Sequence, residues 1–267
     1  KEFGGGKGAN QAIAASRLAA DTTFISKVGK DGNANFILED FKKAGIHTQY
    51  ILTSESEETG QAFITVDEAG QNTILVYGGA NMTLSATDVE MSVDAFIGAD
   101  FVVAQLEVPF EAIEQAFKIA RKQNITTVLN PAPAIELPKS LLELTDIIIP
   151  NETEAELLTG ISINNESDMK ETATYFLDLG ISAVLITLGE QGTYCAYQEQ
   201  YKMIPACNVK AIDTTAAGDT FIGAFLSELN KDLSNLESAI RLANQASSLT
   251  VQRKGAQASI PTRKEVE

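Results

Sequence analysis

The segment 213–219 contains the residue types that phosphoryl transfer to an alcohol requires. It places two carboxylates, Asp213 and Asp219, around threonines, alanines and a glycine, and an apolar run with helical spacing follows. Small side chains let a ligand approach the backbone, and the free N–H groups at a helix start favour an anion. Asp219, in the expected first turn, should be ionised and could accept a proton from a hydroxyl group. An ordinary helix cap with the same residue types is the alternative interpretation.

A second glycine-rich segment, at residues 4–10, also precedes an expected helix and contributes Lys7 and Asn10. It has neither the spacing of a P-loop nor a complete G-x-G-x-x-G at dinucleotide spacing. Bare glycine amides beside an Asn side chain suit a ligand with many hydroxyl groups, which needs several directed hydrogen bonds. A flexible loop followed by a helix start is the alternative.

Polar residues also follow the expected strands. Glu107 comes after a buried-strand pattern and could accept hydrogen bonds from sugar hydroxyls, or be an ordinary loop residue. Asn151 and Glu154 have the spacing of a capping box, and the same groups could hold water or Mg²⁺ near phosphates. The segment 187–192 is a strand end and a tight turn, which could hold an adenine edge or simply form a hairpin.

The composition limits the classes of function. The chain has 267 residues and a formal net charge of −16, which argues against a nucleic-acid footprint. No apolar run approaches the roughly 20 residues that span a bilayer. The two cysteines, Cys195 and Cys207, fit neither a metal spacing nor a disulfide framework, which favours reduced thiols in the cytoplasm. A single histidine, His47, argues against a zinc site or a Ser-His-Asp triad.

Short apolar runs alternate with helical stretches along most of the chain. This alternation predicts an α/β fold with a mostly parallel central sheet and helices on both faces. Ligands bind such sheets beyond the carboxyl ends of the strands. Strands are expected at 22–28, 101–104, 127–129, 147–149 and 184–186. Helices are expected at 8–20, 35–44, 110–122, 140–144, 152–158 and 167–179.

The pattern changes between residues 60 and 77. Two β-type runs flank a polar loop at 67–72, which predicts a β-hairpin. A hairpin inside a helix–strand alternation indicates a flap that leaves the main sheet. We therefore expect an α/β core of residues 1–59 and 78–267 and a small β-hairpin lid of residues 60–77.

Together these segments resemble the ribokinase-like (PfkB) family of carbohydrate kinases. Residues 5–12, GGKGANQA, are similar to the family's N-terminal signature, and residues 213–221, DTTAAGDTF, to its C-terminal signature. Segments 130–134, 150–154 and 253–257 are similar to stretches of its ribose-phosphorylating members, so the resemblance covers essentially the whole chain. It implies ATP-dependent phosphorylation of D-ribose at the 5-hydroxyl. The alternatives are a kinase of the same family acting on 2-deoxyribose, fructose or adenosine, and a non-catalytic sugar- or nucleotide-sensing module.

The resemblance implies roles for individual residues. Asp219 would take the proton of the sugar hydroxyl. An anion hole for the γ-phosphoryl group would be formed by the N–H groups of Ala216, Ala217 and Gly218. The sugar would also be held by Gly5, Gly6, Lys7, Asn10 and Glu107. The nucleotide would be bound by Asn151, Thr187, Gly189, Gly192 and Asn244.

The cofactors that the resemblance implies are ATP, Mg²⁺ and K⁺. Asn151 and Glu154 would organise the phosphates and Mg²⁺. A monovalent cation would lie beside the anion hole. Its ligands would come from Asp213, Thr215 and Ser259, and from the carbonyl groups of Thr250, Arg253 and Gly255.

Members of the family begin with a strand that carries an Asn and an Asp for the sugar, and nothing before Lys1 supplies these groups here. We expect this strand, with part of the lid, either to be absent from the protein or to lie outside this sequence. In the family the lid closes over the sugar and pairs between subunits. The resemblance therefore implies a homodimer formed through the lid, with ribose and ATP as partners and no nucleic acid or membrane.

Overall fold

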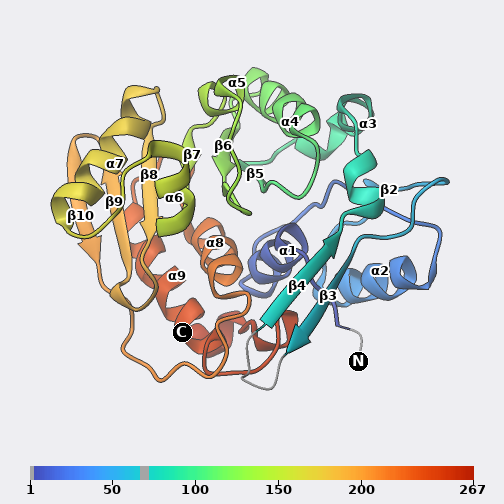
Figure 1. Ribbon diagram of the computed structural model, residues 1–267. Coiled ribbons are helices and arrows are strands. Elements are labelled where there is room, and N and C mark those ends of the chain that lie inside the picture. The colour runs from blue at the N-terminus through green and yellow to red at the C-terminus, as the bar shows by residue number, and fades with distance from the viewer. Residues whose placement is uncertain (1–2, 67–71) are drawn as a thin grey trace.

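The computed structural model describes residues 3–66 and 72–267, and its elements alternate along the chain (Figure 1). The strands are β1 Ser26–Val28, β2 Ile51–Thr53, β3 Gln61–Val66, β4 Asn72–Tyr77, β5 Phe101–Ala104, β6 Thr126–Leu129, β7 Ile147–Ile148, β8 Ala183–Thr187, β9 Thr193–Tyr197 and β10 Gln200–Ile204. The α-helices are α1 Lys7–Arg17, α2 Gly32–Ala44, α3 Ala86–Met91, α4 Phe110–Lys122, α5 Lys139–Glu143, α6 Glu152–Thr159, α7 Glu166–Asp178, α8 Ala217–Glu228, α9 Leu236–Thr250 and α10 Arg263–Val266. Among the described residues, no helix is long and apolar enough to cross a membrane.

The main sheet has six strands in the order β10-β9-β8-β7-β6-β5. Strands β5 to β8 are parallel to one another, whereas β9 and β10 extend the sheet as an antiparallel hairpin. This confirms the expected mostly parallel α/β sheet. The carboxyl ends of β5 to β8 lie at one edge, where the sequence has Glu107, Asn130, Asn151 and Thr187.

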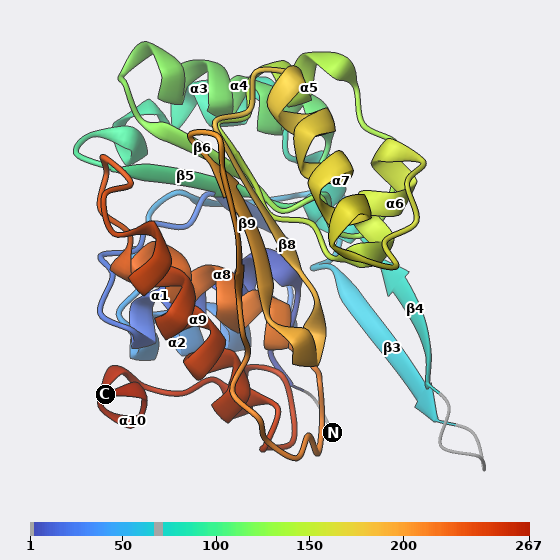
Figure 2. The same cartoon turned by 90° about the vertical axis from the view of Figure 1, so that its left-hand side faces the viewer.

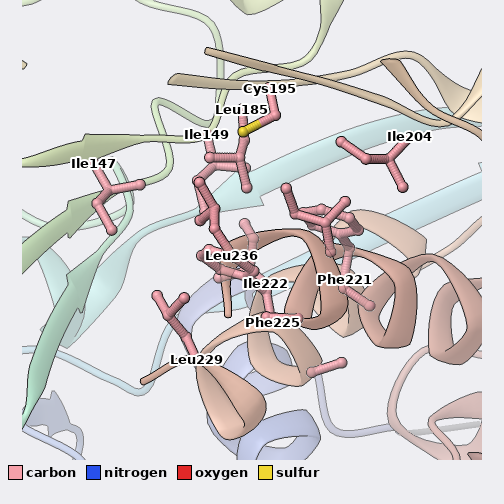
Figure 3. Close-up of a cluster of buried hydrophobic side chains, with 14 of the residues drawn as sticks. Ile147, Ile149, Leu185, Cys195, Ile204, Phe221, Ile222, Phe225, Leu229 and Leu236 are labelled. Atoms are coloured by element: carbon pink, nitrogen blue, oxygen red, sulfur yellow. The ribbon is translucent and has the colours of Figure 1, made fainter. Parts of the chain in front are cut away.

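Helices cover both faces of this sheet (Figures 1 and 2), and alternate residues of the buried strands pack against them. In β8, Ala183 and Leu185 belong to the core that α8 and α9 cover, whereas Val184 and Ile186 belong to the core under α4, α5 and α7. Figure 3 shows the first of these cores, in which Phe221 and Phe225 of α8 lie beneath the sheet. A strand buried on both faces needs apolar residues throughout, which explains the continuous apolar runs in the sequence.

The remaining strands form two small sheets. Strands β1 and β2 pair in parallel, and β3 and β4 form an antiparallel hairpin that projects from the body (Figure 2). The hairpin confirms the two β-type runs, while loop residues 67–71 lie outside the described residues. Phe63, Leu75 and Val76 of the hairpin expose more than half of their surface.

Some expected bounds differ from those in the structure, and the helix expected at 8–20 ends at Arg17 in α1. The strand expected at 22–28 begins only at Ser26, as β1. Thr23, which precedes it, makes a single isolated bridge to His47 and not a continuous ladder. The β9–β10 hairpin was not expected as part of the sheet. Its first strand, Thr193–Tyr197, has the sequence Thr-Tyr-Cys-Ala-Tyr, which lacks the run of aliphatic residues used to find the other strands.

The close approach of α1 to α8 depends on Gly223. A Cβ atom at this position would lie 2.5 Å from Ala14 Cβ and 2.7 Å from the carbonyl oxygen of Gln11. Only a residue without a side chain permits this spacing between two helix backbones. The two glycine-rich segments are therefore held together by the packing of the helices that follow them.

We predict that Gly223→Ala lowers the free energy of unfolding by about 1–3 kcal/mol, because an added methyl group must push α1 away from α8. Chemical denaturation measures this change. The matched control is Gly32→Ala in α2, where an added Cβ meets no heavy atom within 4 Å. Equal stability of the two variants would contradict the predicted close packing.

Candidate active site

The amino end of α8 presents backbone amides next to a carboxylate. Ala216 adopts a left-handed conformation, with φ of 60°, immediately before the helix, and Asp219 lies in the first turn. Gly218 and Asp219 have no intrahelical acceptor for their N–H groups at such a position. The N–H of Ala217 lies 3.2 Å from the carbonyl oxygen of Thr214. The expected helix start is confirmed, and the positive end of the α8 dipole points towards the space in front of Asp219.

A cavity of about 230 Å³ opens in front of this helix start. It brings together residues from both glycine-rich segments and from the carboxyl ends of β6, β7 and β8. The residues that line it are Lys7, Asn130, Ala132, Ile149, Asn151, Glu154, Thr187, Thr214, Ala216, Ala217, Gly218, Asp219 and Ile222. A larger open depression of about 710 Å³ lies at the amino ends of β6 and β7. The smaller cavity is the better candidate, because ligands of parallel sheets bind at the carboxyl ends of the strands.

Asp219 accepts hydrogen bonds from two side-chain amides of α1. Asn10 Nδ2 donates to one carboxylate oxygen at 2.9 Å, and Gln11 Nε2 donates to the other at 3.1 Å. Burial raises the pKa of Asp219, while the hydrogen bonds from Asn10 and Gln11 and the charge of Lys7 oppose that rise. A carboxylate with a raised pKa and a fixed orientation is suited to accept a proton.

Glu107 and Glu154 share this environment with Asp219. Burial raises the pKa of both carboxyls, and Lys7 acts against the rise at each of them. The backbone N–H of Lys7 also donates to Glu107 at 2.8 Å, which ties the start of α1 to the loop after β5. The positive charge of Lys7 therefore acts on three acidic groups, Glu107, Glu154 and Asp219.

Asn151 and Glu154 form the capping box that their spacing indicates. Asn151 Oδ1 accepts from the N–H of Glu154 at 2.8 Å, and the Glu154 carboxylate accepts from the N–H of Asn151 at 2.9 Å. Glu154 is only 6% exposed, yet it lines the cavity. The box fixes a carboxylate beside the space in front of α8.

The residues expected at a monovalent cation lie near one another but outside the cavity lining. Asp213 accepts from the N–H and hydroxyl of Thr215 and, at 2.9 Å, from the N–H of Gly255. These bonds, led by the one from Gly255, lower the pKa of Asp213. The N–H of Arg253 donates to the carbonyl of Thr250, and Ser259 is fully buried. Asp213 is thus tied to the 250–259 region, while Asp219 faces the cavity.

The residues expected at the nucleotide lie in two different places in the structure. Thr187 lines the cavity at the end of β8, and Gly189 and Gly192 form the turn into β9 with positive φ values of 55° and 110°. Asn244 is buried, and both ends of its amide bond to the protein, to Thr193 and to the carbonyls of Ile204 and Pro205. Asn244 therefore holds α9 against the β9–β10 hairpin.

The glycines expected at the sugar lie at the approach to α1. Gly6 is the residue before the helix and has a φ of 94°, a conformation that favours glycine. An added Cβ at Gly5 would meet nothing within 4 Å, whereas one at Gly6 would contact the Glu107 carboxylate at 3.7 Å. Gly6 thus lies beside Glu107, but Gly5 and Gly6 do not line the cavity.

Comparison with known proteins gives a family. A family model described as "pfkB family carbohydrate kinase" matches residues 1–263. The chain belongs to the PfkB family. Relatives in this family include the ribokinase of Staphylococcus aureus, which is 65% identical over 266 residues, 100% of this chain and 88% of the relative. The ribokinase of Haemophilus influenzae is 45% identical over 261 residues, covering 98% of this chain and 85% of the relative.

A solved structure in the PfkB family supports the same architecture. Arabidopsis thaliana ribokinase, complexed with ribose and ATP, superposes with a TM-score of 0.93 at 33% identity. The match covers 98% of this chain and 86% of that chain. The α/β fold with a mostly parallel sheet is thus shared with a ribokinase whose structure contains ribose and ATP.

Gln11 and Asn130 lie in the segments 5–12 and 130–134 that carry the resemblance, but no individual role was predicted for them, although both belong to the hydrogen-bonded surroundings of Asp219. Gln11 Nε2 also donates to Asn130 Oδ1 at 3.0 Å, and Asn130 lines the cavity. Position offered a signal for each. Gln11 directly follows Asn10 near the start of α1, and Asn130 directly follows the buried strand β6.

We predict that Lys7→Met lowers the thermal unfolding midpoint more at about pH 7.5 than at about pH 4.5. Carboxyls whose folded-state pKa is raised disfavour folding increasingly as the pH rises through those pKa values. Loss of Lys7 raises the pKa values of Glu107, Glu154 and Asp219 further. Scanning calorimetry across this pH range measures the effect.

The control for this prediction is Lys139→Met, because Lys139 pairs with Glu143 on the exposed surface of α5. Its effect on the midpoint should be small at every pH. A destabilisation by Lys7→Met that does not depend on pH would show that Lys7 does not act through the three carboxyls.

Proposed function

We propose that this chain transfers the γ-phosphoryl group of ATP to the 5-hydroxyl of D-ribose, giving D-ribose 5-phosphate. Membership of the PfkB family and 65% identity to a ribokinase support an ATP-dependent sugar kinase. The observation that carries the proposal is Asp219, a largely buried carboxylate held by Asn10 and Gln11 in a cavity with the amide-rich start of α8. That site combines a base for an alcohol with a cradle for an anion.

Phosphoryl transfer asks the protein mainly to position groups and to stabilise charge. In our proposal, Asp219 orients the 5-hydroxyl for in-line attack on the γ-phosphorus and accepts its proton late, as the new O–P bond forms. The N–H groups of Ala216, Ala217 and Gly218 stabilise the charge on the transferring group, helped by the dipole of α8. The 3.2 Å contact of the Ala217 N–H with Thr214 would then have to give way to the phosphoryl oxygen.

An unpaired acceptor supports the sugar subsite. Asn10 is 6% exposed, and among the described residues its Oδ1 atom has no hydrogen-bond partner. A buried acceptor without a partner is costly, and a sugar hydroxyl would supply the missing donor. We assign Asn10, Lys7, Glu107, Gly5 and Gly6 to sugar binding.

We assign to nucleotide binding the residues Asn151, Thr187, Gly189 and Gly192. Asn244 would support this site indirectly, by holding α9 against the β9–β10 hairpin. Glu154 offers a buried carboxylate at the cavity, which suits Mg²⁺, a cation that prefers oxygen ligands. Bound Mg²⁺ would neutralise phosphate charge.

The site proposed for K⁺ likewise offers only oxygen ligands. They come from the side chains of Asp213, Thr215 and Ser259 and from the carbonyls of Thr250, Arg253 and Gly255. A cation there would add positive charge beside the start of α8.

We also propose a division of the chain into a core, residues 1–59 and 78–267, and a lid, residues 60–77. The β3–β4 hairpin exposes Phe63, Leu75 and Val76, and pairing of two lids in a homodimer would cover them. Closure of the lid over the sugar would exclude water from the transferring phosphoryl group. Cys195 and Cys207 are free thiols, which is compatible with the cytoplasmic location we propose.

We predict that ATP-dependent ADP release is fastest, judged by kcat/KM, with D-ribose among ribose, 2-deoxyribose, fructose and adenosine. Asp219→Ala should lower kcat by about 100-fold to 10,000-fold, the usual contribution of a general base, while the Kd for ATP changes little. A coupled assay and calorimetry measure the two quantities.

Each outcome of this assay decides one point. Faster turnover of another sugar would show that the chain is a kinase for that sugar and not for ribose. Binding of ribose and ATP without turnover would indicate a sensing module. Near-normal kcat in Asp219→Ala would remove Asp219 from its role as base.

A further inference from the structure

Two side-chain amides, those of Asn130 and Gln11, connect a backbone carbonyl to Asp219, and a third amide, that of Gln105, bonds to the other end of Gln11. Asn130 Nδ2 donates to the carbonyl of Ile149 at 3.0 Å, and Asn130 Oδ1 accepts from Gln11 Nε2 at 3.0 Å. The same Gln11 nitrogen donates to Asp219 at 3.1 Å. Gln11 Oε1 accepts from Gln105 Nε2 at 2.5 Å. Gln11 is 2% exposed and Asn130 is 7% exposed.

The direction of this chain is determined at its backbone end. A carbonyl oxygen can only accept, so Asn130 must turn its NH₂ group to Ile149 and its oxygen to Gln11. Gln11 must then turn its own NH₂ group to Asn130, and that group is also the one that faces Asp219. The side-chain oxygen of Gln11 then accepts a hydrogen bond from Gln105. A flipped Gln11 would oppose its oxygen to the oxygens of Asn130 and Asp219.

We propose that Gln11 is a positioning residue for the phosphoryl-transfer base: the Asn130–Gln11–Gln105 chain fixes one carboxylate oxygen of Asp219 as a hydrogen-bond acceptor and so sets the orientation of the carboxylate. Asn10 holds the other oxygen, and the two amides come from successive residues of α1, at the end of its first turn and the start of its second. The carboxylate plane is therefore set by α1 and β6 before a substrate arrives. This inference rests on the proposed function only for its effect on turnover.

The other charged groups around Asp219 do not reproduce this constraint. Lys7 on α1, Glu107 in the loop after β5 and Glu154 on α6 influence Asp219 through their charge. None of them donates a side-chain hydrogen bond to its carboxylate among the described residues. Their effect changes smoothly with distance, whereas an amide hydrogen bond requires one geometry. Loss of Gln11 should therefore affect both the proton affinity and the orientation of Asp219.

The test compares two variants of nearly equal size, Gln11→Met and Gln11→Glu. Gln11→Met removes the donor, so we expect kcat with ribose to fall about tenfold to a hundredfold, the usual effect of losing one hydrogen bond to a charged group. The acidic limb of the kcat–pH profile should move to higher pH, because the charged form of Asp219 has lost a donor. Gln11→Glu should move the limb further, and the KM for ATP should stay within about twofold of wild type.

Two controls separate positioning from general packing. Gln105→Met leaves the donor on Gln11 but frees its far end, so it should give a smaller shift of the same sign. Thr172→Val removes a fully buried hydroxyl in α7 that has no partner among the described residues, and it should leave the pH profile unchanged. Thermal unfolding of each variant reports the packing effect. Lower stability without a shift of the acidic limb in Gln11→Met would overturn the proposal.

A second measurement does not require turnover. The ¹³C chemical shift of the Asp219 carboxyl, assigned by its loss in Asp219→Asn, reports the titration of this group directly. Its midpoint should be higher in Gln11→Met than in wild type. If wild type phosphorylates no sugar but this difference is found, the proposed function fails and the positioning by Gln11 stands. If wild type is active and the midpoints coincide, the positioning role fails and the kinase stands.

Discussion

The site depends on the burial of one carboxylate between two helix starts. Asn10 and Gln11 bond to Asp219 across 209 and 208 positions of sequence. Without them, burial would remove water from the ionised carboxylate with few hydrogen bonds to replace it. The contact requires α1 and α8 to approach closely, and Gly223 permits that approach. In the proposed function, both glycine-rich segments serve one site: the first would orient the base, and the second would supply the amides for the phosphoryl group.

The sheet provides the other half of the geometry. Its parallel strands β6, β7 and β8 end at the same edge, and they deliver Asn130, Asn151 and Thr187 to one cavity. The apolar cores on both faces, with Phe225 under one and Phe117 under the other, hold these strand ends in register with α8. A rigid edge of this kind is what a reaction that relies on positioning needs.

Much of this arrangement follows from residue patterns. Apolar runs locate β5 to β8, and the spacing of Asn151 and Glu154 gives the capping box. Asp213 and Asp219 could not be distinguished by pattern alone. In the structure hydrogen bonds lower the pKa of Asp213, whereas burial raises that of Asp219. The place of Gln11 was also hidden, because its partners come from distant segments and only the fold brings them together.

A double-mutant cycle would show whether the start of α1 and Asp219 act as one unit. The kcat/KM for ribose would be measured in wild type, Asn10→Ala, Asp219→Ala and the double variant. The account predicts strong non-additivity: once Asp219 is gone, the loss of Asn10 should cost much less than it does in wild type. Additive losses would contradict the account, because they would mean that the two residues act independently.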